Sequence, residues 1–166
     1  MQLFRSELQF GFEKKCTLIP IKSLDVPNLK FGKPDIHCEL SCKQENQGFK
    51  LTGNLSCNLL MNCDRCLTEF QNNQDILIKL ILTSRNDLLS EENDEIILFP
   101  EEMKEIDITH FIRDSIQLSN PIKTVCKISC KGLCSICGIN LNMKSCNCTS
   151  RQKYTPFDKL DHLISN

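Results

Sequence analysis

The sequence predicts an α+β protein with three parts: an antiparallel β-sheet-rich N-terminal part, one or two helices, and a cysteine-rich module near the C-terminus. Three observations lead to this fold class. Polar and apolar residues alternate over 49–63, apolar residues recur at helical spacing over 107–118, and six of the twelve cysteines crowd into 126–148. A period of two indicates a strand and a period near 3.6 indicates a helix, so the three patterns mark successive parts of the chain.

The strand prediction is strongest over 49–63, where nearly every second residue is apolar. Leu60 is the exception on the polar side. This alternation is typical of an antiparallel strand with one buried face. Shorter strands are expected at 36–42, 76–82 and 96–99. Three cysteines fall on the apolar faces, where a free thiol behaves as a small hydrophobic residue, and we expect them in the core: Cys38, Cys42 and Cys57.

Two helices are expected, each with its own start signal. Asp107 can cap a helix that runs to about Leu118. Thr155 and Pro156 provide a capping residue and a first helical position for a second, C-terminal helix. We therefore divide the chain into a β-rich domain with an acidic segment and a helix (1–120), a cysteine-rich metal-binding module (121–153) and a C-terminal helix (154–166).

Composition limits the function classes. The net charge of −1 argues against nucleic-acid binding driven by bulk charge. The first 20 residues lack the apolar run of a signal peptide, and no stretch approaches the ~18 apolar residues of a membrane span. We therefore expect a cytoplasmic protein with no membrane contact. In a reducing compartment, clustered thiols bind metal or perform redox chemistry more often than they form disulfides.

The cysteines of 126–148 predict a zinc site. Cys134-Ser-Ile-Cys137-Gly138 has the form of a metal knuckle, because two thiolates three positions apart can chelate one ion and the glycine permits a tight turn. Four thiolates favour zinc over hard cations. We predict one zinc ion with two reserve ligands, Cys130 first and Cys126 second, beside the four main ligands Cys134, Cys137, Cys146 and Cys148. A two-metal cluster of all six thiolates is the alternative.

This zinc is expected to be structural. The segment has few apolar residues with which to fold, so a metal would hold it together. A catalytic zinc keeps an open position and usually has histidine or carboxylate ligands, yet no histidine lies between His110 and His162. We also find no phosphate-binding glycine loop, nucleophile elbow or paired-carboxylate motif. We therefore predict no catalytic residue.

Charge is segregated along the chain. Residues 91–107 carry eight acidic residues and one lysine, a sum of −7, whereas 115–157 carry six basic residues and no acidic one. With a zinc–thiolate site of charge −2, the latter segment would retain about +4. We predict a phosphate-facing surface that includes Lys127, Lys131, Lys144 and Arg151. A basic surface that merely balances the acidic segment explains the charges equally well.

A second motif, Cys63-Asp-Arg-Cys66-Leu67, follows the longest predicted strand. A redox pair of this spacing usually opens a helix, but turn and strand residues follow here. Three interpretations stay open: a reduced structural turn, half of a second metal site, or a surface on which Arg65 contacts phosphate. The structural turn is the preferred one.

These motifs together resemble the YceD family, the large ribosomal RNA subunit accumulation proteins. The resemblance rests on the Cys63–Leu67 element and on the string Cys130-Lys-Gly-Leu-Cys134 through Asn142, with Cys146 and Cys148 beyond it. It covers roughly residues 15–164. It implies a bacterial or plastid-type factor, located in the plastid stroma in a eukaryote, that is needed for large-subunit ribosomal RNA to accumulate and has no known catalytic activity.

The functional hypothesis is therefore a binding module in large-subunit biogenesis, not an enzyme. Its expected partners are precursor ribosomal RNA (23S) or a large-subunit ribosomal protein, with no small-molecule substrate. One alternative is a thiol redox protein that uses Cys63 and Cys66. Another is a protein–protein adaptor without RNA contact, which would use the acidic segment 91–107.

Overall fold

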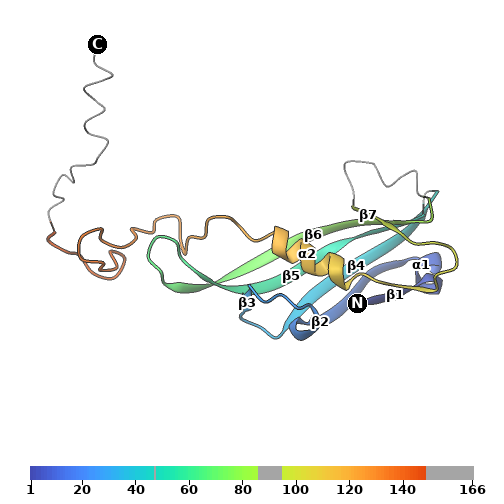
Figure 1. The fold of residues 1–166 in the computed structure, drawn as a ribbon, viewed down its shortest axis with the longest axis horizontal. Coiled ribbons are helices and arrows are strands. Elements are labelled where there is room, and N and C mark those ends of the chain that lie inside the picture. The colour runs from blue at the N-terminus through green and yellow to red at the C-terminus, as the bar shows by residue number, and fades with distance from the viewer. Residues whose placement is uncertain (47, 86–94, 149–166) are drawn as a thin grey trace, which may run out of the picture. The chain divides into compact units, whose positions relative to one another are not determined.

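The structure, a computed structural model, describes residues 1–46, 48–85 and 95–148 (Figure 1). The chain divides into two compact units, and each is described by itself. The β-domain comprises residues 1–61 and 69–124. The cysteine module comprises residues 62–68 and, within the described part, 125–148. The predicted division at residue 120 did not include the 62–68 segment. The predicted helix at 154–166 lies outside the described residues.

In its described residues, the β-domain is built on a six-stranded sheet. The strand order is β2-β4-β5-β6-β7, and β3 pairs with β5. The pairs β2–β4, β4–β5 and β3–β5 are antiparallel, whereas β6 and β7 are parallel. The strands are β2 (Phe12–Pro20), β3 (Lys30–Phe31), β4 (Asp35–Glu45), β5 (Gly48–Asn62), β6 (Glu69–Thr83) and β7 (Glu95–Leu98).

The predicted strands are confirmed, and on β4 and β5 so is the face predicted to be buried. On β5, the residues buried on this face are Phe49, Leu51, Leu55, Cys57, Leu59 and Met61, all at odd-numbered positions. The three cysteines expected in the core are buried as well: Cys38, Cys42 and Cys57. Because side chains alternate across a strand, a shift of one residue would expose this whole apolar set, so the alternation fixes the register. The parallel direction of β7 was not predicted, because alternation over four residues carries no information about strand direction.

The predicted helix is α2 (Thr109–Leu118), which contacts β6 (Figure 1). Phe111, Ile112 and Ile116 are its buried residues. Asp107 precedes the helix, and its Oδ1 accepts a hydrogen bond from the Thr109 backbone N–H at 2.9 Å. Asp107 therefore supports the first turn as expected, although Ile108 occupies the cap position itself.

The N-terminal elements were not predicted, because they are too short for periodicity to show. They are β1 (Gln2–Phe4), α1 (Arg5–Phe10) and the 3₁₀ turn η1 (Ile21–Ser23). β1 pairs antiparallel with β8 (Glu105–Asp107). The Arg5 guanidinium lies 3.9 Å from the Phe99 ring centre and donates to the Phe99 and Pro100 carbonyls. Arg5 thereby anchors the segment after β7 to α1.

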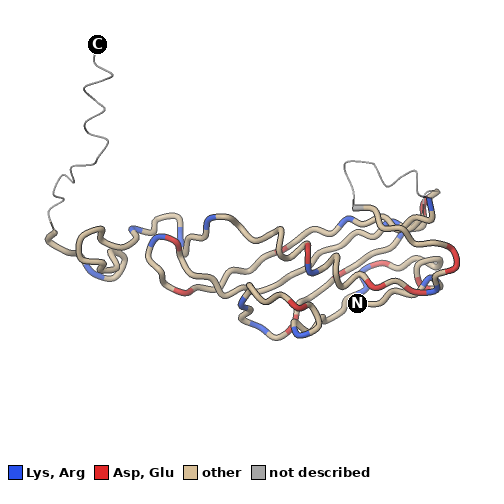
Figure 2. The backbone as a smooth tube through the Cα atoms, viewed as in Figure 1, with Lys and Arg blue, Asp and Glu red and all other residues tan. Residues whose placement is uncertain are grey.

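Acidic and basic residues are interspersed along the backbone of the β-domain (Figure 2). Among the described residues, no helix combines the length and the apolar character needed to cross a bilayer.

Candidate metal centres

The cysteine module has almost no apolar interior. Its buried residues are three cysteines and one glycine, namely Cys63, Cys66, Cys130 and Gly132. Among its larger apolar side chains, Leu133, Ile139 and Leu141 are only partly buried. Four others are more than half exposed: Leu67, Ile128, Ile136 and Met143. Sulfur atoms rather than hydrocarbon therefore meet inside the module.

Two sets of four cysteines converge there. The Cys63 cluster consists of Cys63, Cys66, Cys126 and Cys130. The Cys134 cluster consists of Cys134, Cys137, Cys146 and Cys148. Within each cluster the four sulfurs lie within 4.8 Å of one another, so each set can hold a metal ion. All eight thiols are free of disulfide bonds.

The Cys134 cluster begins with a tight turn. The Cys134 N–H donates to the Ile139 carbonyl at 2.8 Å, and the Gly138 N–H donates to the Cys134 carbonyl at 2.9 Å. Gly138 closes the turn at φ 71°, a left-handed conformation that glycine adopts without strain. The N–H groups of Cys137 and Ile136 donate to the Cys134 sulfur and lower the pKa of its thiol to about 6.

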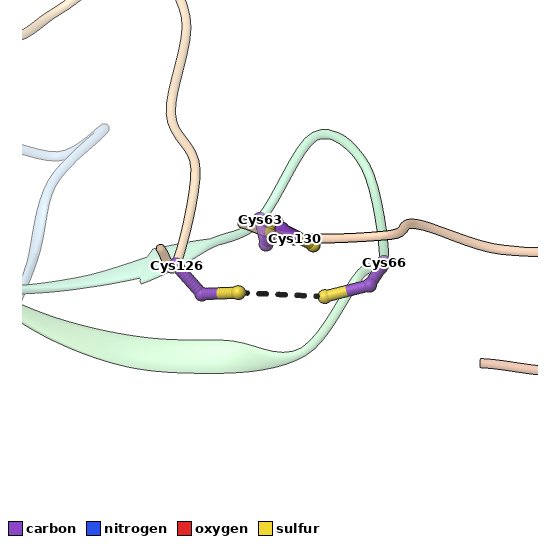
Figure 3. Close-up of side chains that lie close together, drawn as sticks. All are labelled: Cys63, Cys66, Cys126 and Cys130. Atoms are coloured by element: carbon purple, nitrogen blue, oxygen red, sulfur yellow. Dashed lines mark hydrogen bonds between the residues drawn. The ribbon is translucent and has the colours of Figure 1, made fainter. Parts of the chain in front are cut away.

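The Cys63 cluster joins two segments that are distant in sequence (Figure 3). The 62–68 segment supplies Cys63 and Cys66, and the 125–130 segment supplies the other two thiols. The sulfurs of Cys63 and Cys130 are 3.8 Å apart, and those of Cys66 and Cys126 are 3.7 Å apart. Burial opposes ionisation of Cys63, but N–H groups of Cys126, Cys66 and Arg65 donate to its sulfur and lower its pKa to about 6.

Each cluster contains at least one thiol with a lowered pKa and at least one with a raised pKa. The pKa of Cys126 is raised to about 12 by burial and by its hydrogen bonds with neighbouring thiols. The pKa of Cys148 is raised to about 12 by its hydrogen bond with Cys137 and by burial. Crowded thiols cannot all ionise together, because thiolates repel one another. A divalent cation removes this repulsion, so the donor sets fit a metal ion better than they fit free thiols.

Hydrogen bonds surround the Cys63 cluster. Arg65 Nη1 donates to the Cys130 carbonyl at 3.1 Å and to the Ile128 carbonyl at 3.5 Å, while the Leu133 N–H donates to the Arg65 carbonyl at 2.9 Å. Asn142 Nδ2 donates to the Cys130 sulfur at 3.3 Å. The predicted phosphate contact Arg65 is exposed, but it also ties the two cysteine-bearing segments together.

The family model for the large ribosomal RNA subunit accumulation protein YceD matches residues 51–164, which include both segments of the cysteine module. The chain belongs to the YceD family. It is 28% identical over 165 residues to the Arabidopsis thaliana protein named large ribosomal RNA subunit accumulation protein YCED homolog 1, chloroplastic, an alignment covering 84% of this chain and 51% of the relative.

A Zea mays protein of the same name is 49% identical over 59 residues, which cover 35% of this chain and 20% of that relative. The chain thus spans at most about half the length of these YceD-family relatives. No solved structure matches it.

In this YceD-family chain, the four predicted main zinc ligands lie together as the Cys134 cluster. The two reserve ligands, Cys130 and Cys126, lie in the other cluster, and the thiols form two sets of four rather than one set of six. Lys127, Lys131 and Lys144 are exposed. The fourth predicted phosphate contact of this segment, Arg151, lies outside the described residues. Whether these residues bind zinc or RNA stays a prediction.

Sequence reasoning listed Cys63 and Cys66 as half of a metal site but preferred a structural turn. The number of cysteines in the sequence points to a second set of four ligands. Twelve cysteines minus four, the three on apolar strand faces and Cys16, leave eight, which is two complete sets of four ligands.

The net charge of the cysteine module, whose charged residues are coloured in Figure 2, depends on whether a second metal ion is bound. Its described residues carry four basic groups and one carboxylate, Asp64, a sum of +3. Two divalent ions on eight thiolates would add +4 − 8 = −4 and leave about −1. The surplus of about +4 expected from the sequence assumed a single ion and also counted Lys123, Arg151 and Lys153, which lie outside this set. Any attraction to phosphate must therefore come from where the lysines lie, not from the module's net charge.

Proposed function

We propose that this chain is an accessory factor for the accumulation of large-subunit (23S) ribosomal RNA. It acts in large-subunit biogenesis by binding RNA or a ribosomal protein, and it is not an enzyme. The observation that carries this proposal is the family match across the whole described cysteine module. The names of the plant relatives, both large ribosomal RNA subunit accumulation proteins, support it.

The Cys134 cluster is proposed to hold a structural zinc ion. Its donors are four thiolates, the set that zinc favours in closed tetrahedral sites. Among the residues that the structure describes, no histidine or carboxylate belongs to the cluster, so this donor set leaves no position of the kind that activates water in a hydrolytic zinc site. The ion would supply the folding free energy that the module's exposed apolar side chains do not.

The surface of the cysteine module combines charge with apolar area. Lys127 and Lys131 flank the exposed Ile128, and Lys144 follows the exposed Met143. Lysines attract phosphate, and exposed apolar side chains favour contact with bases or with a protein partner. Such a surface on a metal-bound module suits docking onto a ribonucleoprotein particle.

One observation favours a thiol redox role: the pKa of Cys63 is lowered to about 6. A redox thiol also needs access to its substrate, and Cys63 is fully buried. The same N–H donors that lower its pKa are those expected around a metal-bound thiolate. The geometry therefore supports metal binding over redox chemistry.

The test is complementation of cells that lack this protein. Cells receive the wild-type chain, a variant with Lys127→Glu, Lys131→Glu and Lys144→Glu, or a control with Lys22→Glu, Lys43→Glu and Lys79→Glu. The control lysines are exposed residues of the β-domain. We expect the ratio of large- to small-subunit ribosomal RNA to be restored by the wild type and the control, but not by the module variant.

RNA and protein partners are separated by crosslinking the tagged chain with and without ribonuclease. With RNA as the partner, the salt dependence of binding should fall by about one unit of log–log slope per lost phosphate contact. Failure of the wild-type chain to change the ribosomal RNA ratio would overturn the proposed function. Full activity of the module variant would overturn only the role of the lysines.

A further inference from the structure

We propose that Cys63, Cys66, Cys126 and Cys130 bind a second zinc ion, so that the cysteine module is a two-zinc unit. This inference concerns what the chain contains and does not depend on its role in ribosomal RNA accumulation. Three observations carry it: a repeated turn geometry, the spacing of the sulfurs, and the groups that surround them.

The Cys63–Thr68 turn has the same backbone geometry as the Cys134–Ile139 turn. The Leu67 N–H donates to the Cys63 carbonyl at 2.8 Å, as Gly138 does to Cys134, and the Cys63 N–H donates to the Thr68 carbonyl at 3.0 Å, as Cys134 does to Ile139. The residue after the second cysteine is left-handed in both turns, with φ 58° at Leu67 and 71° at Gly138.

The likeness extends to the first sulfur of each turn. In both turns it accepts the N–H groups of the residues two and three positions on, which are Arg65 and Cys66 for Cys63. A left-handed conformation costs a non-glycine residue about 1 kcal/mol or more, and Leu67 keeps the geometry of the Cys134 turn although it is not a glycine. The 62–68 segment is therefore a second metal knuckle.

The sulfur spacing matches a tetrahedral zinc site. Zinc–sulfur bonds of about 2.3 Å at tetrahedral angles place neighbouring sulfurs roughly 3.8 Å apart. Two of the sulfur pairs, Cys63–Cys130 and Cys66–Cys126, are 3.8 and 3.7 Å apart, and all four sulfurs lie within 4.8 Å of one another. Bonded sulfurs in a disulfide lie only about 2.05 Å apart, so this spacing fits a shared ion and not a cystine.

The surroundings of these thiols favour the charged form. Cys63, Cys66 and Cys130 are at most 5% exposed, and isolated thiolates at such burial would be costly without a cation. Donors nevertheless point at the sulfurs. Asn142 Nδ2 donates to the Cys130 sulfur at 3.3 Å, and the Thr68 backbone N–H donates to the Cys66 sulfur. Donors of this kind orient and stabilise the thiolate ligands of a metal.

The decisive experiment is native mass spectrometry of the full chain, purified without added zinc, together with elemental analysis. We expect two zinc ions per wild-type chain. Cys63→Ser with Cys66→Ser should leave one, and Cys134→Ser with Cys137→Ser should also leave one. Cys16→Ser removes an exposed cysteine that belongs to neither cluster and should leave both.

Two outcomes would overturn the inference. One is a single zinc ion per wild-type chain, with four module thiols that react freely with an alkylating reagent; this measurement needs no variant to fold. The other is iron in place of the second zinc. The ribosomal RNA ratio in complemented cells is a separate readout, so failure of the second zinc and failure of the proposed function are distinguishable.

Discussion

Asn142 lies in the sequence between the two ligand pairs of the Cys134 cluster, yet its Nδ2 donates a hydrogen bond to the sulfur of Cys130 in the other cluster, at 3.3 Å. Asn142 Oδ1 also accepts the Lys131 N–H at 2.9 Å. The loop that one metal site would organise thus completes the surroundings of the other, so the two sites should be coupled.

We therefore expect Asn142→Ala to weaken zinc binding at the Cys63 cluster, by about 10-fold or more, because donors to metal ligands contribute on this scale. The measurement is competition with a chromophoric chelator in the otherwise intact chain, where alkylation of Cys63 or of Cys134 shows which cluster has lost its zinc. Met143→Ala is the matched control, since Met143 is the next residue and 80% exposed. Equal zinc affinities for the two alanine variants would contradict the coupling.

Two glycines with nearly the same left-handed backbone test the packing of the module. Gly132 has φ 76° and Gly138 has φ 71°. A Cβ at 132 would lie 3.0 Å from the Arg65 carbonyl oxygen, which already accepts the Leu133 N–H, whereas a Cβ at 138 would meet nothing within 4 Å.

Gly138→Ala should cost only the backbone strain, about 1 kcal/mol, which is about fivefold in zinc affinity. Gly132→Ala should cost clearly more, because the Cβ also pushes against the segment that carries Cys63 and Cys66. Chelator competition on both variants compares them directly. A larger loss for Gly138→Ala would show that the packing of Gly132 against Arg65 is incorrect.

The cysteines should fall into three classes of reactivity towards an alkylating reagent. In the zinc-bound chain, the exposed Cys16 should react alone. Chelation should add the eight cluster thiols. Cys38 and Cys42 should stay unreactive in both states, because burial shields them and raises their pKa to about 11.

The pH dependence of this reaction has a definite sign. Only the thiolate reacts, so any slow alkylation of Cys38 should rise about tenfold per pH unit from neutral pH towards pH 11. Peptide mapping by mass spectrometry locates the labelled residues. Rapid labelling of Cys63 in the zinc-bound chain would instead support the thiol redox alternative.

Stability of the β-domain should depend on its own core. Ile112 of α2 is fully buried. Ile112→Ala should lower the free energy of unfolding of this domain by about 2–5 kcal/mol, the usual cost of emptying such a site. Denaturant unfolding measures this, and zinc content should stay unchanged under native conditions. Loss of zinc without loss of β-domain stability would contradict the assignment of Ile112 to that core.

Much of the β-domain could be predicted because its strands carry their information locally. The alternation on β5 marks the buried face residue by residue, and helical spacing marks α2. The pairing of β1 with β8 joins segments about 100 residues apart through three-residue strands. No local pattern encodes such a pairing.

Of the two clusters, the Cys134 cluster could be predicted, again because its pattern is local in the sequence. The Cys134 knuckle contains Gly138, and a glycine at this position predicts a left-handed turn from the sequence alone. The equivalent position of the other knuckle is Leu67, a residue that does not suggest this conformation. The partners of Cys63 and Cys66 also lie more than 55 residues away, at Cys126 and Cys130. Only the fold shows that these four thiols meet.

We expect metal–thiolate bonds, rather than apolar packing, to hold the cysteine module together. Amide-resolved NMR of the full chain before and after chelation of zinc tests it most directly. We expect the dispersed signals of residues 62–68 and 125–148 to collapse on chelation and to return with zinc, while those of the β-domain persist. A module that keeps its dispersed signals without metal would contradict the claim.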